Sequence, residues 1–254
     1  MKLFVMNAGD IRNPNKGMLT PGRDEGVPIT IPVSMYLIDH PDGLVLVDTG
    51  NAVYHWPEFL WGDHDDDPKE NADRRIAELG YDPKKVKYVI MSHMHGDHAG
   101  GMELFPDATF IVRREELKTA WWPPCREPGA GFYMYPDYKD TRLFKYTELD
   151  DDEDFDVFGD GTVICTDTRG HTRGHQSVVV DLPETGKTVL ALDAASLKEN
   201  LDDRIYPGTG TWDIDMGLRS IDKLRKLRDE GAFIILGHDP EQWKSLKKAP
   251  DHYS

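Results

Sequence analysis

The sequence contains little cysteine and no long apolar run. Its two cysteines, Cys125 and Cys165, lack the close spacing of metal ligands, so we expect reduced core residues instead of a disulfide. No stretch approaches the roughly 20 apolar residues that a membrane span requires, so no membrane partner is expected. The apolar stretch within residues 1–7 is too short for a secretory signal peptide. Together these absences favour a cytoplasmic protein.

Positive charge is also scarce. The chain carries 46 acidic and 30 basic residues, a formal net charge of −16 at pH 7. A surface with this balance repels polyanions, so nucleic acid is not expected as a partner. The acidic residues concentrate in 63–67 and 150–156, but neither stretch has the alternating ligands and central glycine of a calcium loop. We interpret both stretches as solvated loops.

Strand-like and helix-like segments alternate along the chain. Two apolar runs, 31–39 and 44–48, flank a turn and predict a hairpin. Apolar residues at helical spacing predict helices over 69–80 and 214–230. A short strand over 2–6, followed by a loop over 7–28, is expected at the beginning of the chain. Further short strands are expected at 86–91, 109–112, 162–166, 177–181, 188–192 and 233–236. This alternation without a linker predicts a single α/β domain over residues 1–254.

The most distinctive stretch, residues 92–100, directly follows the apolar run 86–91. It places His93, His95 and His98 together with Asp97 within six positions. A surface turn rich in histidine is the plain alternative. Imidazole and carboxylate groups together suit a divalent transition metal such as zinc. His93 and His95 can point the same way, but the adjacent Asp97 and His98 cannot easily join both on one ion. The spacing therefore suggests two metal ions side by side.

Three more residues of ligand type follow the ends of predicted strands. They are His171, Asp193 and His238, each within a few positions of the point where an apolar run stops. One such coincidence would carry little weight. Together with the histidine-rich stretch, the three residues indicate loops that converge on one edge of a sheet sandwich.

The sequence resembles the metallo-β-lactamase superfamily, whose mark His-x-His-x-Asp-His stands here at residues 93–98. The later ligand positions of that superfamily match Gly170-His171, Asp193 and Gly237-His238. Within it, the chain is most similar to the N-acyl-homoserine lactonases. Supporting stretches span almost the whole length and lie at 19–22, 46–50, 79–83, 171–177 and 237–242.

The resemblance implies a four-layered αβ/βα sandwich that holds two divalent metal ions. The implied ligand sets are His93 with His95 and His171, Asp97 with His98 and His238, and Asp193 as a bridge between the ions. Zinc is the expected metal, and iron, cobalt and manganese are compatible with the same ligands. His175 matches no ligand position, so we expect it to support the site by a hydrogen bond or to be simply buried.

The implied chemistry is hydrolysis of a small-molecule substrate. Two ions that share a water lower its pKa from about 15.7 towards about 7, so the bridging hydroxide can attack a carbonyl. Asp97 would carry a proton to the leaving alkoxide. The predicted reaction is opening of N-acyl-homoserine lactones, as in quorum quenching. Hydrolysis of another lactone, a thioester, a β-lactam or a phosphotriester is the alternative, and a non-hydrolytic metal-binding or redox protein is a more distant one.

Two positions depart from the lactonase pattern. The resemblance implies a tyrosine three residues after the bridging aspartate, where it would hydrogen-bond the substrate carbonyl, but Ser196 stands there. Arg173 replaces the proline of the common motif in the loop that supports His171. We expect Ser196 to contact substrate, and Phe59 and Trp61 to line an apolar pocket, with anchoring of their own loop as the alternative. The sequence leaves the oligomeric state open.

Overall fold

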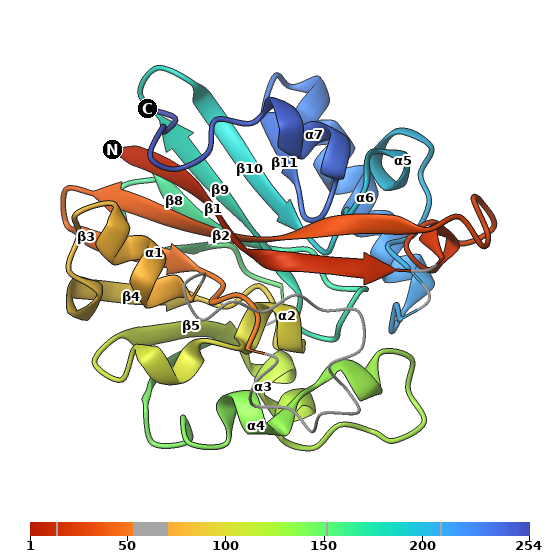
Figure 1. Cartoon of the computed structure of the whole chain (residues 1–254), viewed down its shortest axis with the longest axis horizontal. Coiled ribbons are helices and arrows are strands. Elements are labelled where there is room, and N and C mark those ends of the chain that lie inside the picture. Colours follow the sequence, from red (N-terminus) through yellow and green to blue (C-terminus); the bar gives the residue numbers. More distant parts are fainter. Residues whose placement is uncertain (14, 53–70, 151, 209) are drawn as a thin grey trace.

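The computed structural model describes residues 1–13, 15–52, 71–150, 152–208 and 210–254. Two β-sheets face each other, and helices cover their outer sides (Figure 1). The six-stranded sheet has the order β1 (Lys2–Asn13), β2 (Ile29–His40), β3 (Gly43–Val47), β4 (Val86–Ile90), β5 (Thr109–Arg113) and β6 (Lys145–Leu149). The five-stranded sheet has the order β11 (Phe233–Leu236), β10 (Gly186–Leu192), β9 (Gln176–Leu182), β8 (Val163–Asp167) and β7 (Phe155–Asp156).

The helices are short apart from one near the carboxyl end. They are α1 (Ala72–Glu78), α2 (Gly96–Ala99), α3 (Arg114–Trp121), α4 (Tyr135–Tyr138), α5 (Lys198–Asp202), α6 (Ile214–Asp229) and α7 (Pro240–Ser245). Single 3₁₀ turns occur at η1 (Lys16–Met18), η5 (Pro83–Lys85), η6 (Met102–Leu104) and η7 (Ala130–Phe132). The helix predicted over 214–230 is confirmed as α6, and the Asp213 side chain caps it by accepting the Met216 N–H. The helix predicted over 69–80 is present as α1, after which Gly80 adopts a φ of 84°.

The first strand is longer than predicted. β1 extends to Asn13, so part of the segment 7–28 that was expected to be a loop is strand. The cause is pairing, because residues 10–13 continue the antiparallel register opposite residues 29–32 of β2 after a register shift beyond Asn7. Gly9, inside this shift, has a φ of 106°, which glycine adopts without strain.

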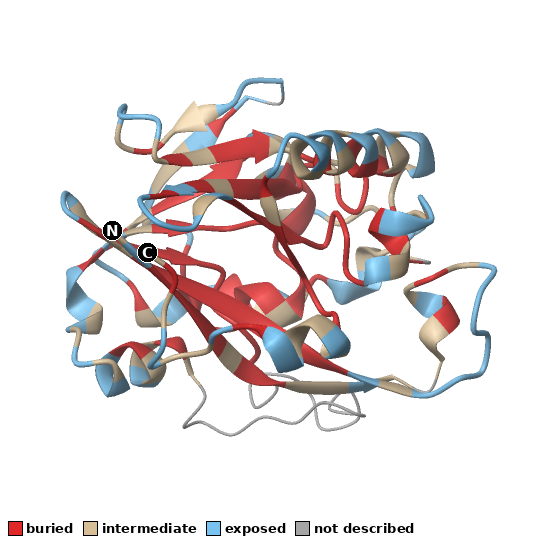
Figure 2. Ribbon diagram, turned by 90° about the horizontal axis from the view of Figure 1, so that it is seen from above, coloured by how far each residue is buried: buried red, intermediate tan, exposed pale blue. Residues whose placement is uncertain are grey.

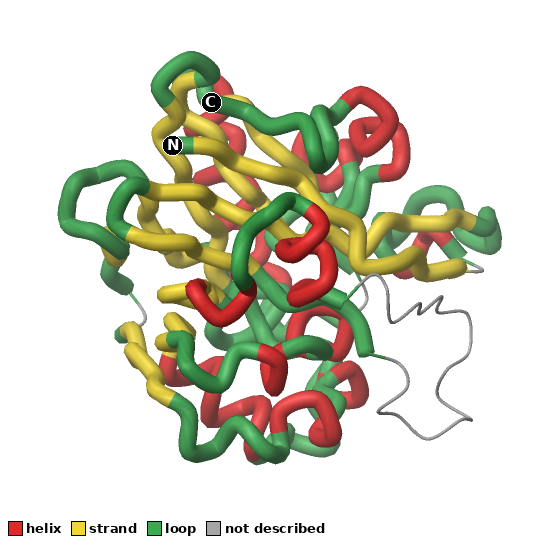
Figure 3. Tube along the Cα trace, turned by 60° about the vertical axis from the view of Figure 1, so that its left-hand side comes forward, coloured by secondary structure: helices red, strands yellow, loops and turns green. Residues whose placement is uncertain are grey.

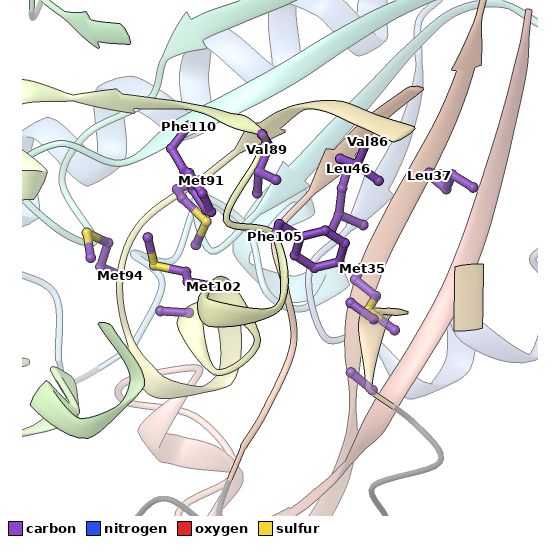
Figure 4. Close-up of a cluster of buried hydrophobic side chains, with 14 of the residues drawn as sticks. Met35, Leu37, Leu46, Val86, Val89, Met91, Met94, Met102, Phe105 and Phe110 are labelled. Atoms are coloured by element: carbon purple, nitrogen blue, oxygen red, sulfur yellow. The ribbon is translucent and has the colours of Figure 1, made fainter. Parts of the chain in front are cut away.

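Alternating strand residues build the layers of the molecule. In β1, Leu3 and Val5 point into a buried cluster that also contains residues of the other sheet, such as Val178. Phe4 and Met6 point to the opposite face, where a second cluster packs under the helices α1 to α4; Figure 4 shows part of this cluster. A third cluster joins β10 and β11 to α5 and α6. Figure 2 shows the buried strands between the more exposed helices. The predicted four-layered αβ/βα sandwich is confirmed.

The two sheets meet at the edge where β3, β4, β8, β10 and β11 end. Gln176 at the start of β9 links the sheets there: its backbone N–H donates to the Ser92 carbonyl at 2.9 Å, and its Nε2 donates to the Met91 carbonyl at 2.8 Å. The two chain ends lie beside each other (Figure 3), and Leu3 and Tyr253 exchange backbone hydrogen bonds of 2.8 and 2.9 Å. No helix among the described residues has the length and apolar character to cross a membrane.

Candidate metal centre

Asp48, directly after β3, holds the histidine-rich loop that follows β4. Its buried carboxylate accepts hydrogen bonds from the Ser92 backbone N–H at 2.7 Å and from Ser92 Oγ at 2.6 Å. The same carboxylate lies 2.7 Å from His98 Nδ1. When Nδ1 carries the proton in this contact, Nε2 of His98 is free to bind a metal ion. Asp48 therefore positions both the loop backbone and one imidazole ring.

The first group of ligand-type atoms belongs to three buried histidines. His93, His95 and His171 each direct one ring nitrogen into a space where these atoms lie within 4.8 Å of one another. His95 Nδ1 and His171 Nε2 are 3.2 Å apart. Burial lowers the pKa of all three rings, and that of His93 and His95 falls well below its usual value. Neutral rings keep the lone pairs that a metal ion needs.

The second group combines a carboxylate with two histidines. Asp97 Oδ2 lies 3.5 Å from His98 Nε2 and 3.6 Å from His238 Nε2. Burial alone lowers the pKa of His98 and His238, but neighbouring carboxylates outweigh it and hold both pKa values above the usual one. His238 Nδ1 is 2.8 Å from the Pro32 carbonyl, which orients the ring from behind. The positive charge that His98 and His238 can carry is therefore compensated by the nearby carboxylates.

Asp193 lies between the two groups. Its Oδ1 is 3.0 Å from His238 Nε2 and 3.3 Å from His98 Nε2, whereas its Oδ2 is 3.4 Å from His171 Nε2. Burial raises the pKa of Asp193, but the adjacent His238 and His98 outweigh it, so the pKa stays well below its usual value. An ionised carboxylate with one oxygen toward each group has the arrangement needed to bridge two cations.

The donor set fits divalent metal ions. Among the described residues, His93 Nε2 is buried without a hydrogen-bond partner, and His98 Nε2 and Asp193 Oδ1 contact only other groups of the site. Unpartnered buried polar atoms are uncommon in folded proteins and call for an explanation. Imidazole nitrogens and carboxylate oxygens are the donors that zinc and related divalent ions accept. A pair of such ions would satisfy all three atoms.

Comparison with known proteins identifies the family of this chain. The sequence model of the Metallo-beta-lactamase superfamily matches residues 29–238, a range that includes all seven ligand-type positions. The chain belongs to the metallo-beta-lactamase superfamily. N-acyl homoserine lactonase AttM of Azorhizobium caulinodans is 35% identical over 265 residues, covering 100% of this chain and 98% of the relative. N-acyl homoserine lactonase AiiA of Bacillus thuringiensis subsp. kurstaki is 33% identical over 277 residues, covering 99% and 98%.

Solved structures also resemble this chain over almost its whole length. A quorum-quenching N-acyl homoserine lactone lactonase superposes with a TM-score of 0.85 at 28% identity, covering 99% of this chain and 97% of the other. An N-acyl homoserine lactone hydrolase with the product N-hexanoyl-L-homoserine bound at its catalytic metal center superposes with a TM-score of 0.86 at 27% identity, covering 99% and 98%. The resemblance inferred from the sequence is confirmed.

The structure gathers every predicted ligand but not every predicted substrate contact. The seven residues that come together are His93, His95, Asp97, His98, His171, Asp193 and His238. Ser196 is buried beside them: its carbonyl accepts the His238 N–H at 2.9 Å, and its Oγ has no hydrogen-bond partner in the part of the chain that the structure describes. Phe59 and Trp61 lie outside the described residues, so their contact with substrate stays a prediction.

His175 contacts Asp193 through one of its ring nitrogens. Its Nε2 accepts the Asp193 backbone N–H at 3.1 Å, and its Nδ1 lies 3.0 Å from Thr168 Oγ1. Burial, with the neighbouring His171, lowers the pKa of His175 to about 3. A neutral His175 can therefore accept at Nε2 and hold the Asp193 backbone in place.

Glu116 on α3 is a supporting residue that sequence reasoning missed. This fully buried carboxylate accepts the Met94 N–H at 2.8 Å and the Tyr133 hydroxyl at 3.0 Å on one oxygen, and the Gly174 N–H at 3.1 Å on the other. It thereby ties the histidine-rich loop to the loop that carries His171. The sequence holds one sign of this role. Glu116 stands four positions before Ala120, so both side chains lie on the same, inward face of the short helix.

We predict that Glu116→Gln lowers the free energy of unfolding of the metal-free protein by about 1–3 kcal/mol. An amide offers one acceptor oxygen, so a buried backbone N–H at Met94 or Gly174 loses its partner. Urea unfolding followed by circular dichroism measures the change. Glu115→Gln, on the same helix but partly exposed, is the matched control and should shift stability by less than about 0.5 kcal/mol. Equal effects of the two substitutions would contradict this role of Glu116.

Proposed function

We propose that the protein is a metal-dependent hydrolase that opens the lactone ring of N-acyl homoserine lactones. The observation that carries the proposal is the pair of ligand groups with Asp193 between them. It occurs in a chain that aligns over its whole length with N-acyl homoserine lactonases at up to 35% identity. A structural neighbour at 27% identity holds a ring-opened homoserine product at its metal center.

The ligand assignment follows the geometry of the two groups. His93, His95 and His171 would hold one ion, and Asp97, His98 and His238 would hold the other. Asp193 would contact both ions through its two carboxylate oxygens. Zinc is the metal we propose, with iron, cobalt and manganese compatible with the same donors. Two such ions supply a hydroxide nucleophile at neutral pH and polarise the lactone carbonyl.

Asp97 is the residue that we propose to move the proton. Its side chain is 20% exposed, whereas those of His98 and His238 are each 2% exposed, so the Asp97 carboxylate is the one most open to an incoming substrate. Burial raises the pKa of Asp97, but the adjacent His98 and His238 outweigh it, so the carboxylate is ionised at rest. Asp97 would therefore first accept the proton of the attacking oxygen and then pass it to the alkoxide that ring opening releases. Nδ1 of His98 contacts Asp48 and Nδ1 of His238 contacts the Pro32 carbonyl, so the far side of each of these two rings is held by the protein.

A comparison of substrate classes tests this function. Metal-reconstituted protein is assayed with lactones, thioesters, β-lactams and phosphotriesters, and kcat/KM is compared across the classes. N-acyl homoserine lactones should give the highest value. A higher kcat/KM for a thioester or a phosphotriester would replace the lactonase assignment with that activity. Consumption of oxygen or NADH without hydrolysis would favour a redox protein.

The metal content provides a separate prediction. Wild-type protein should bind two divalent ions per chain, and Asp193→Ala should lose both occupancy and activity because one carboxylate serves both ions. Elemental analysis after removal of excess metal measures the occupancy. Asp222 lies on α6 in an exposed ion pair with Arg204, so Asp222→Asn is the control and should retain two ions. An Asp193→Ala protein with two tightly held ions would refute the bridging role.

Ser196 provides a prediction about the substrate carbonyl. The Ser196 hydroxyl is buried and has no hydrogen-bond partner among the described residues. Its side chain is much shorter than that of tyrosine, so a water or a tyrosine from another loop, such as Tyr206, would have to complete the missing donor. An oriented donor to a developing oxyanion contributes about 2.7–4 kcal/mol. We therefore expect Ser196→Tyr to raise kcat/KM for homoserine lactones and Ser196→Ala to change it only slightly.

Thermal unfolding must accompany the Ser196 assays, because a larger side chain in a buried position can strain the fold. A Ser196→Ala protein that binds two ions but no longer turns over lactone would identify Ser196 itself as the donor. That result would contradict the interpretation that the site lost a hydrogen-bond donor when serine took the place of tyrosine at position 196.

The proposal also covers the domain organisation, the partner and the cellular location of the protein. We treat residues 1–254 as one domain, supported by the pairing of β1 with β2 and by the contact between Leu3 and Tyr253. The partner is a small-molecule substrate, and the strong negative charge argues against nucleic acid. A cytoplasmic location fits the two cysteines, which are both free in the structure. Cys165 is buried as expected, whereas Cys125 is exposed, so the expected core position was wrong for Cys125.

A further inference from the structure

Arg173, the residue in place of the proline of the common motif, joins two segments of the chain through its side chain. Its Nε donates to Glu127 Oε2 at 3.0 Å, and its Nη2 pairs with Glu127 Oε1. The guanidinium carbon lies 4.6 Å from the centre of the Trp212 ring. Arg173 therefore joins Glu127, in the segment after α3, to Trp212, in the loop before α6.

Both joined segments also contact the first histidine group. The Trp212 backbone N–H donates to the His171 carbonyl at 3.0 Å. The ring of Phe132 lies edge-on to His95, with ring centres 5.4 Å apart. Gly129 has a φ of 79°, and a Cβ there would lie 2.5 Å from the Gly210 carbonyl oxygen, so the two segments touch directly. They close over one side of His95 and His171.

A small cavity remains between this closure and the two histidines. Its volume is about 10 Å³, roughly the space of one water molecule, and its lining includes His95, His171 and apolar groups of Pro124, Pro128, Tyr133 and Trp212. The side chains of Arg173 and Glu127 are 33% and 25% exposed, whereas His95 and His171 are buried. The ion pair thus stands between the buried histidines and solvent.

We propose that the Arg173–Glu127 pair, packed on Trp212, limits the length of acyl chain that the enzyme accepts. The pair fills the outer wall of an apolar pocket that begins at the proposed metal ligands His95 and His171. With the pair in place, the pocket has no room for a methylene chain. This inference rests on the proposed lactonase function and names the residues that set its substrate range.

The chemistry of arginine explains why this residue suits the role. A planar guanidinium can pair with both oxygens of Glu127 and lie over the Trp212 ring at the same time, whereas lysine offers a single point charge. The pair is partly exposed, so solvent screens it and its loss need not unfold the protein. Removing the arginine side chain should open the apolar wall without removing a metal ligand.

The test compares short and long acyl chains on the metal-loaded enzyme. The quantity measured is the ratio of kcat/KM for N-decanoyl over N-butyryl homoserine lactone. Arg173→Ala should raise this ratio by about fourfold for each methylene that becomes buried, mainly through a lower KM for the decanoyl substrate. Glu127→Gln should shift the ratio in the same direction, and Arg173→Lys should lie between Arg173→Ala and wild type. Asp222→Asn, in the remote pair with Arg204, should match the wild-type ratio.

A binding measurement separates failure of this inference from failure of the proposed function. Calorimetry with N-butyryl- and N-decanoyl-L-homoserine reports the affinity without any turnover. If no variant hydrolyses a lactone but Arg173→Ala binds the decanoyl compound more tightly, the lactonase assignment is wrong and the role of Arg173 stands. If lactones are hydrolysed and neither the kinetic ratio nor the binding ratio changes by more than about twofold, the role of Arg173 is wrong.

Discussion

The site depends on a carboxylate, Asp193, that is held with its two oxygens facing different groups of imidazoles. Five histidines and two aspartates are gathered in a largely buried space, and His95 Nδ1 and His171 Nε2 lie only 3.2 Å apart. Lone pairs that face each other are unfavourable unless a proton or a cation lies between them. Binding of divalent ions would relieve this conflict, so the free energy of metal binding should contribute directly to the stability of the fold.

Residues behind the ligands hold this arrangement from several directions. Asp48 fixes His98 and the start of the histidine-rich loop, and His175 fixes the backbone of Asp193. Glu116 joins the loop of His95 to the loop of His171, which come from opposite sheets. Each of these contacts is buried and uses most of the hydrogen-bonding capacity of its residue. Together they tie the two sheets to each other around the site.

The sequence predicted the parts that depend on local pattern. The motif at 93–98 is contiguous, and the strands that deliver His171, Asp193 and His238 are apolar enough to recognise. The strands β6 and β7 were not predicted. They are polar, partly exposed edge strands, and only the three-dimensional structure shows their pairing. The extension of β1 to Asn13 depends on its partner strand, and the roles of Glu116 and Glu127 depend on loops distant in the sequence. Such long-range contacts leave no periodic signal.

The pairing of Leu3 with Tyr253 has a practical consequence for handling the molecule. Lys2 pairs with Asp39, close to where β3 begins, whereas the proposed ligands His93 and His95 follow the opposite end of the parallel strand β4. Both chain ends therefore emerge together on the side away from the catalytic edge. The enzyme should tolerate immobilisation on a solid support through either end, or a circular permutation that joins the two, with its substrate entrance left unobstructed.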